Sequence, residues 1–191
     1  MDYTELKSKV EGMIKPSRFI HSLGVAETSL YLARRFGLDE KAALCAGIYH
    51  DAYRYSATAE SVDELEKAGF VLTAEEKSEP MLLHGALAAL HFDADCGENV
   101  GEDMKKAVRH HTLGSRDMGS LGAVLYIADY MEPGRKHLSE KDRLDIMEKS
   151  TLEEMTALII EMQKPYLDRD KGGMAEVTAD LYDYITSGGR F

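Results

Sequence analysis

The sequence has few cysteines. Only Cys45 and Cys96 occur in 191 residues, and they do not form a C-x-x-C pair. Two isolated thiols cannot supply a zinc ribbon or a disulfide framework. This scarcity excludes a disulfide-stabilised secreted fold and is typical of a protein from a reducing compartment.

Positive charge and long apolar runs are also scarce. The chain has 23 lysines and arginines against 34 aspartates and glutamates, a net charge of −11. This balance disfavours binding to nucleic acid, where phosphate contacts dominate affinity, although a few local cations can still hold a small anionic ligand. No apolar run approaches the length of a membrane span, and the N-terminus lacks the apolar core of a signal peptide. We therefore expect a cytoplasmic protein that binds neither nucleic acid nor a membrane.

Strand signals are missing as well. No segment alternates convincingly between apolar and polar residues, and no Asn-Gly or Asp-Gly hairpin turn occurs. Apolar residues recur at helical spacing instead. This spacing predicts helices over residues 16–36, 39–53, 81–92, 100–111 and 121–131. We expect an all-α protein in which residues 1–191 form one compact helical bundle, with the motifs in residues 16–136 and further helices at 139–186 packed on them.

Side chains that can ligate a metal are spread over these helices. Five of the seven histidines fall on four separate predicted helices: His21, His50, His84, His110 and His111. Asp51 follows one of them directly, and Asp129 lies in the segment YIADYMEPGR. Imidazole nitrogens and carboxylate oxygens together are the donors of zinc, iron and manganese sites. Because helical bundles build such sites from single ligands on several helices, we expect a metal site in the core.

Each of these residues also has an ordinary structural interpretation. The histidines fit singly as hydrogen-bonded core residues or as charges at a helix end, and Asp129 fits as a partner of Arg135. A buried carboxylate is nevertheless costly unless it is paired or bound to a metal. Since Asp51 and Asp129 both lie in apolar segments, one shared cation explains the set better than several coincidences.

Basic residues near the same segments indicate an anionic ligand. On a continuous helix, Arg54 shares a face with His50 and Asp51 and can hold a phosphate through paired hydrogen bonds; an Asp51–Arg54 salt bridge is the alternative. Arg135 is a further candidate. The pair Gly172–Gly173, before the last predicted helix, allows a phosphate to approach that helix N-terminus, although Gly-Gly also marks ordinary turns.

The ordered set His21, His50, Asp51 and Asp129 resembles the ligand pattern of the HD-domain metal-dependent phosphohydrolase superfamily. The segments RFIHSLGVAETSLYLARRFG, AGIYHDAYR, LLHG, VRHHTLG and YIADYMEPGR together resemble its bacterial YqeK-type branch, the symmetrical bis(5'-nucleosyl)-tetraphosphatases. The resemblance covers about residues 16–136, and the residues after it match less clearly.

This resemblance implies an HD-domain fold that binds a divalent transition metal in a mono- or dinuclear site. Iron is the metal implied first, with manganese or zinc as alternatives. The implied metal ligands are His21, His50, Asp51 and Asp129. Asp51 is also expected to orient the nucleophile.

The remaining histidines are implied to serve a second metal or the bridging phosphate. Besides Asp51, the expected catalytic residues are His84 and His110, either of which can assist the leaving phosphate as an acid. We expect the substrate contacts to be Arg54, His84, His110, His111, Arg135 and Gly173.

Members of this branch cleave diadenosine tetraphosphate in the middle and release two ADP. The resemblance therefore implies a dinucleoside polyphosphate substrate, an ADP- or GDP-like product, and attack on phosphorus by a hydroxide that the metal activates. The alternatives are another HD-type nucleotide phosphohydrolase, such as a nucleotidase or an alarmone hydrolase, and a non-catalytic nucleotide-binding module. The oligomeric state stays open, with a homodimer as one alternative.

Overall fold

The computed structural model describes residues 2–98, 100–170 and 173–191. Over these residues the chain forms α-helices and two 3₁₀-helices without any strand, so the predicted all-α class is confirmed. The elements are α1 (Tyr3–Met13), α2 (Pro16–Phe36), α3 (Glu40–Tyr49), α4 (Ser61–Lys67), α5 (Ala74–Ser78), η1 (Pro80–Leu83), α6 (His84–Cys96), α7 (Glu102–His110), η2 (Arg116–Met118), α8 (Gly119–Met131), α9 (Glu140–Met147), α10 (Leu152–Asp170) and α11 (Glu176–Thr186). None of the described helices is long and apolar enough to cross a membrane.

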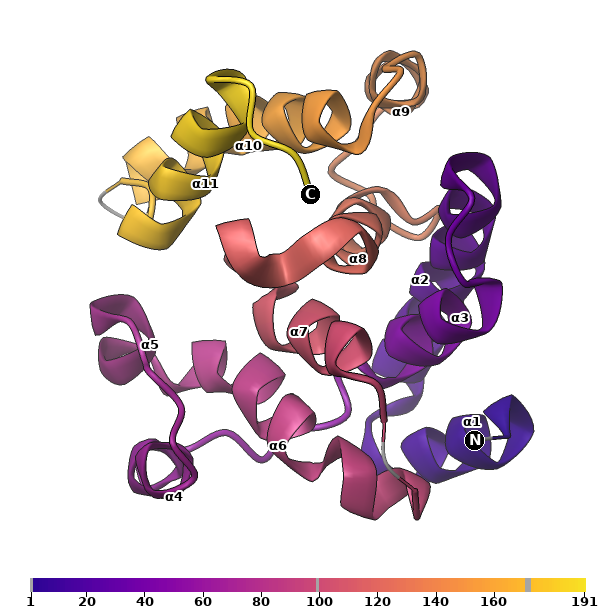
Figure 1. Cartoon of the computed structure of the whole chain (residues 1–191), viewed down its shortest axis with the longest axis vertical. Coiled ribbons are helices and arrows are strands. Elements are labelled where there is room, and N and C mark those ends of the chain that lie inside the picture. The colour runs from indigo at the N-terminus through magenta and orange to yellow at the C-terminus, as the bar shows by residue number, and fades with distance from the viewer. Residues whose placement is uncertain (1, 99, 171–172) are drawn as a thin grey trace.

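Helices α7 and α8 lie in the middle of the molecule, with α2 and α3 along one side of them (Figure 1). Helix α2 packs along α3 and α8, and α7 packs between α6 and α8. Helices α9, α10 and α11 gather at one end beyond α8, whereas α1, α4 and α6 lie toward the opposite end (Figure 1). The main core is built from fully buried apolar side chains such as Val25, Ile48 and Ile127.

Local sequence signals set the start of several helices. Helix α2 begins with Pro16, whose fixed φ and missing N–H suit the first helical position. Helix α3 begins after Asp39, whose carboxylate accepts the N–H of Ala42 at 2.9 Å. Thr73 and Glu76 form a capping box at the start of α5.

Two glycines let neighbouring helices approach closely beside the histidines. A Cβ at Gly47 would lie 2.6 Å from Cα of Ala26 on α2, and a Cβ at Gly85 would lie 2.9 Å from a carbonyl oxygen of α7. Any larger residue would push these helices apart. The close contacts bring His50 of the α3 end and His84 of α6 toward the centre of the molecule.

The helix predicted over residues 39–53 ends earlier, at Tyr49. The imidazole Nδ1 of His50 donates to the carbonyl oxygen of Gly47 at 2.7 Å. The next helical turn would use this same carbonyl oxygen, so the side chain competes with the helix at this point. The chain continues in turns, and the prediction that Arg54 shares one continuous helix with His50 is wrong.

Candidate metal centre

Six histidine and aspartate side chains converge where α2, α3, α6, α7 and α8 meet. Most of them project from the ends of helices, where the chain direction changes and side chains from different elements can meet. They are His21 on α2, His50 at the C-cap of α3, Asp51 in the following turn, His84 at the first position of α6, His111 at the C-cap of α7 and Asp129 on α8.

The four imidazoles share one orientation, with Nδ1 bonded to an oxygen acceptor and Nε2 facing the cluster. The acceptors of Nδ1 are the carbonyl oxygens of Gly47 for His50 (2.7 Å), Met81 for His84 (2.5 Å) and Val108 for His111 (2.8 Å), and the carboxylate of Glu132 for His21 (3.1 Å). A carbonyl or carboxylate oxygen only accepts hydrogen bonds. The geometry therefore assigns the ring proton to Nδ1 and leaves a lone pair on each Nε2.

The Nε2 atoms lie close to the two carboxylates. His21 Nε2 is 3.0 Å from Asp129 Oδ1 and 3.8 Å from Asp51 Oδ2. His50 Nε2 is 3.3 Å from the same Asp51 oxygen, and His84 Nε2 is 3.1 Å from Asp51 Oδ1. Asp51 thus lies at the centre of the cluster and is almost fully buried.

The cluster contains more hydrogen-bond acceptors than donors. The Nε2 atoms of His84 and His111 face each other 3.0 Å apart, although each carries a lone pair. Within the described part of the chain, His50 Nε2 and Asp51 Oδ1 have no hydrogen-bond partner. Buried acceptors without partners are costly, and a cation among them removes that cost. Three sets of three such ligand atoms lie within 4.8 Å of one another, so the donor set fits a metal ion.

The pKa values of these groups also show that the cluster attracts positive charge. Burial acts to lower the pKa of His50, but Asp51 and Asp129 outweigh it and raise that pKa. Burial acts to raise the pKa of both carboxyls, yet His50, together with His21 beside Asp129, holds both pKa values well below their usual range. Burial and two neighbouring imidazoles lower the pKa of His111 to about 3, so this ring stays neutral, as a metal ligand must be.

Three guanidinium groups reach the cluster from its rim. They are Arg18, 2.9 Å from Asp51 Oδ2; Arg54, 3.3 Å from His84 Nε2; and Arg135, paired with Asp129. Each of these arginine side chains remains between 23% and 29% exposed. They can therefore contact both the cluster and a ligand that enters from solvent.

A cavity of about 380 Å³ opens beside the cluster. Arg18, His21 and Arg135, which contact the cluster, line this cavity together with Tyr55 and Lys136. Its lining is strongly basic although the chain as a whole carries a net charge of −11. Such a local basic cavity suits an anionic ligand.

The family model described as HD domain matches residues 18–134, well over half of the chain. The chain belongs to the HD-domain family. The predicted membership is confirmed, and the matched residues include the adjacent His50 and Asp51.

Individual relatives narrow the comparison within the HD-domain family. The chain is 33% identical over 135 residues to a symmetrical bis(5'-nucleosyl)-tetraphosphatase of Bacillus subtilis, covering 71% of this chain and 72% of the relative. A protein of the same name from Halalkalibacterium halodurans is 33% identical over 142 residues, covering 68% and 71%. A crystal structure from Clostridium acetobutylicum, described as a predicted HD superfamily hydrolase involved in NAD metabolism, has a TM-score of 0.85 and 28% identity over 98% of each chain.

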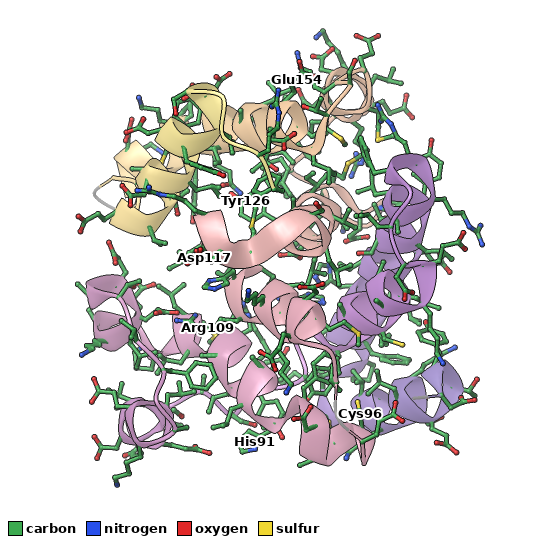
Figure 2. The ribbon with its side chains drawn as sticks, viewed as in Figure 1. His91, Cys96, Arg109, Asp117, Tyr126 and Glu154 are labelled. Carbon is green, nitrogen blue, oxygen red and sulfur yellow. The ribbon has the colours of Figure 1, made fainter. Side chains whose placement is uncertain are left out.

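The structure separates two predicted residues of this HD domain from the cluster. No contact among the described residues joins His110 to it, whereas the neighbouring His111 lies inside. Burial and the adjacent Arg109 lower the pKa of His110 to about 4, so its ring is neutral at pH 7, which disfavours the expected acid role. Arg109, which lies beside His110 in the chain, is on the side of α7 away from α2 and α3 (Figure 2).

The predicted phosphate site before the last helix is also remote from the cluster. Gly173 precedes α11 and does not line the cavity, as far as the described residues show, and Gly172 lies outside the described residues. The N–H of Glu176, the first residue of α11, donates to the carboxylate of Glu75 at 3.2 Å. A side chain of this protein thus already occupies one of the amides at that helix N-terminus.

Three residues of the site did not follow from the sequence patterns. Arg18 lies three residues before His21 on α2, a spacing that places both on one helix face and could have indicated it. Thr112 donates to Nε2 of His111 at 3.1 Å. Glu132 contacts His21 from a position 111 residues along the chain, and only the tertiary structure brings it there.

Proposed function

We propose that this HD-domain protein hydrolyses diadenosine tetraphosphate symmetrically to two ADP. The oxygen of one water forms a bond to one of the two central phosphorus atoms, and the bond from that phosphorus to the bridging oxygen breaks. The bridging oxygen leaves as part of the other ADP, and the two protons of the water go to the new terminal phosphates or to solvent. The observation that carries the proposal is the cluster of inward-facing lone pairs beside a basic cavity. The names of the curated relatives supply the substrate and the symmetrical outcome.

We further propose that the cluster holds a mono- or dinuclear transition-metal centre. The proposed ligands are His21, His50, Asp51 and Asp129, with His84 and His111 facing a second ion or the bridging phosphate. Imidazole and carboxylate donors suit iron, our first choice, and also manganese and zinc. When bound, such a cation lowers the pKa of water and neutralises charge on the phosphate oxygens.

The residues of the chain supply orientation and charge around the reacting phosphate. Arg18, Arg54 and Arg135 now contact the ligand atoms of the cluster. With a cation bound by the cluster, these guanidinium groups would be free to hold phosphate oxygens through charge-assisted hydrogen bonds. Asp51 contacts histidines through both of its oxygens, and its proposed role is to orient the attacking water.

The cavity suits one half of a symmetrical substrate. Its basic walls suit the phosphates of one ADP. Tyr55, which has the Lys15 ammonium 4.5 Å from its ring centre, adds an aromatic ring to the lining. Cleavage in the middle requires that the group gripped on one side of the scissile bond be the size of ADP. The cavity of about 380 Å³ lies within the range typical of small-molecule sites.

Analysis of the reaction products tests this proposal. The purified protein, supplied with ferrous or manganous ions, is incubated with diadenosine tetraphosphate, and the nucleotides are separated by chromatography. We expect ADP alone from the wild type and from Asp95→Asn, a carboxylate away from the cluster, but a loss of product in Asp51→Asn. Equal amounts of AMP and ATP, or turnover only of a mononucleotide or an alarmone, would contradict symmetrical cleavage.

We also propose that residues 1–191 form one HD domain, with the C-terminal helices packed on the motif-bearing core. Helix α10 packs against α8, and its Ile159 and Ile160 belong to the main core. A cytoplasmic location and the oligomeric state stay predictions.

A further inference from the structure

His21 differs from the other three histidines of the cluster in how its ring is held. The other three rings each donate Nδ1–H to a backbone carbonyl three residues earlier in the chain. Nδ1 of His21 instead faces Oε1 of Glu132 at 3.1 Å. Its orientation therefore depends on a side chain that comes from the end of another helix, α8.

Glu132 is itself held firmly in place. The residue is only 4% exposed, and its second carboxylate oxygen accepts the backbone N–H of Gly134. Its own N–H donates to the carbonyl of Ala128 at 2.9 Å, and its carbonyl accepts from Arg143 at 3.2 Å. Both the side chain and the backbone of Glu132 are thus fixed.

The space for this carboxylate depends on glycines. A Cβ at Gly24, one turn after His21 on α2, would lie 2.6 Å from Oε2 of Glu132. A Cβ at Gly134 would lie 2.9 Å from both of its carboxylate oxygens. Residues larger than glycine at these positions would displace the carboxylate from His21.

We propose that Glu132 is a positioning residue that holds His21 with its Nε2 lone pair toward Asp129 and Asp51. A carboxylate that accepts from Nδ1–H fixes the tautomer and the orientation of the ring. Glu132 thereby strengthens the binding of a cation by the cluster. The inference rests on the proposed metal centre but not on which nucleotide the protein cleaves.

The first test measures zinc binding and the His21 tautomer in Glu132→Gln. Calorimetric titration of metal-free protein with Zn²⁺ should show affinity reduced about 10–100-fold, the range for loss of such a carboxylate. Long-range ¹⁵N NMR of the metal-free protein should show a single Nδ1–H tautomer for His21 in the wild type and a mixture in the variant. The His21 signals are assigned by comparison with His21→Gln.

A matched control exists on the molecular surface. His91 Nε2 lies 3.0 Å from Glu64, a carboxylate–histidine pair outside the cluster, and His91 lies at the outer edge of the molecule (Figure 2). Glu64→Gln removes the same kind of contact, so zinc affinity and the His21 tautomer should equal those of the wild type. Gly24→Ala serves as a second variant, because it displaces the carboxylate without changing it and should weaken zinc binding in the same direction.

The outcomes separate this inference from the proposed function. Wild-type zinc affinity together with an unchanged His21 tautomer in Glu132→Gln would overturn the role of Glu132. If Glu132→Gln does not fold, the same result in Gly24→Ala would overturn it. A wild type that binds zinc but leaves diadenosine tetraphosphate intact would contradict the proposed function alone, since neither readout involves a nucleotide.

Discussion

Two polar clusters in this molecule are each centred on an aspartate carboxylate but differ in how their hydrogen bonds are satisfied. In the first, the carboxylate of Asp95 on α6 accepts from the hydroxyls of Tyr49 (2.5 Å) and Tyr53 (3.0 Å) and pairs with the Lys9 ammonium at 2.8 Å. Burial, reinforced by this carboxylate, raises the pKa of both tyrosines, which keeps them protonated as donors. Donors surround the acceptor, and the network is complete within the protein.

The second cluster, around Asp51, is incomplete. Its imidazoles turn lone pairs inward, and His50 Nε2 and Asp51 Oδ1 have no hydrogen-bond partner among the described residues. The protein keeps these acceptors together although the arrangement is unfavourable without a cation. The comparison teaches that a network satisfied by its own donors stabilises the fold, whereas an excess of buried acceptors marks a binding site.

Replacing the central carboxylate of each cluster should separate these roles most clearly. We expect Asp51→Asn to lower kcat/KM for diadenosine tetraphosphate by more than about 100-fold, beyond the usual effect of residues that only support a metal ligand. Asp95→Asn should retain wild-type kcat/KM. Equal losses in the two variants would show that the Asp51 effect is structural.

The next largest difference in activity is expected between variants of the two neighbouring histidines at the end of α7. His111→Ala should reduce activity and metal content by about 10–100-fold, because this ring faces His84 inside the cluster. His110→Ala should change both by less than about threefold, since no described contact joins it to the cluster. Steady-state kinetics and metal analysis check both variants, and a larger loss in His110→Ala would restore the role predicted for it from the sequence.

Replacing an arginine at the rim of the cluster should change KM more than replacing an arginine on the surface, although this difference is smaller than those above. Arg18→Ala should raise KM by about tenfold, equivalent to one charge-assisted hydrogen bond of about 1.5 kcal/mol to phosphate. Arg116, paired with Asp180 on the surface, gives the matched control, because Arg116→Ala should leave KM unchanged. A KM for Arg18→Ala within twofold of the wild type would argue against phosphate binding by Arg18.

Asp95→Asn, in the cluster whose hydrogen bonds are complete, should have the smallest effect on turnover but a clear effect on the stability of the fold. Asp95→Asn leaves the Lys9 ammonium without its partner carboxylate and weakens the acceptor of two tyrosine hydroxyls. We expect it to lower the free energy of unfolding by about 1–3 kcal/mol, measured by urea denaturation of the metal-free protein. The same measurement on Asp51→Asn should show a smaller loss, and the reverse order would contradict the assignment of the two clusters.

The sequence predicts the fold class and the central site residues because helical spacing and residue type are local properties. His21, His50, Asp51 and Asp129 could be grouped from residue type and chain order. The early end of α3 could not be predicted from the sequence, because it depends on the hydrogen bond from the His50 ring to the carbonyl oxygen of Gly47.

Which side chains contact one another in the site, and which nearby side chains stay outside it, depends on tertiary structure. Side-chain type alone cannot distinguish His110 from His111; which of the two faces inward is decided by the close packing of α6 on α7 at Gly85. Glu132 reaches His21 only because α2 and α8 pack together. Residue spacing in the sequence contains no signal for such contacts.

Metal analysis of the purified protein tests the central claim most directly. Elemental analysis should find stoichiometric transition metal, iron by our proposal, in the wild type and in Asp95→Asn. It should find a strong reduction in Asp51→Asn, and chelation should remove activity that added metal restores. A wild-type protein that contains no metal, resists chelators and still converts diadenosine tetraphosphate to ADP would contradict the account.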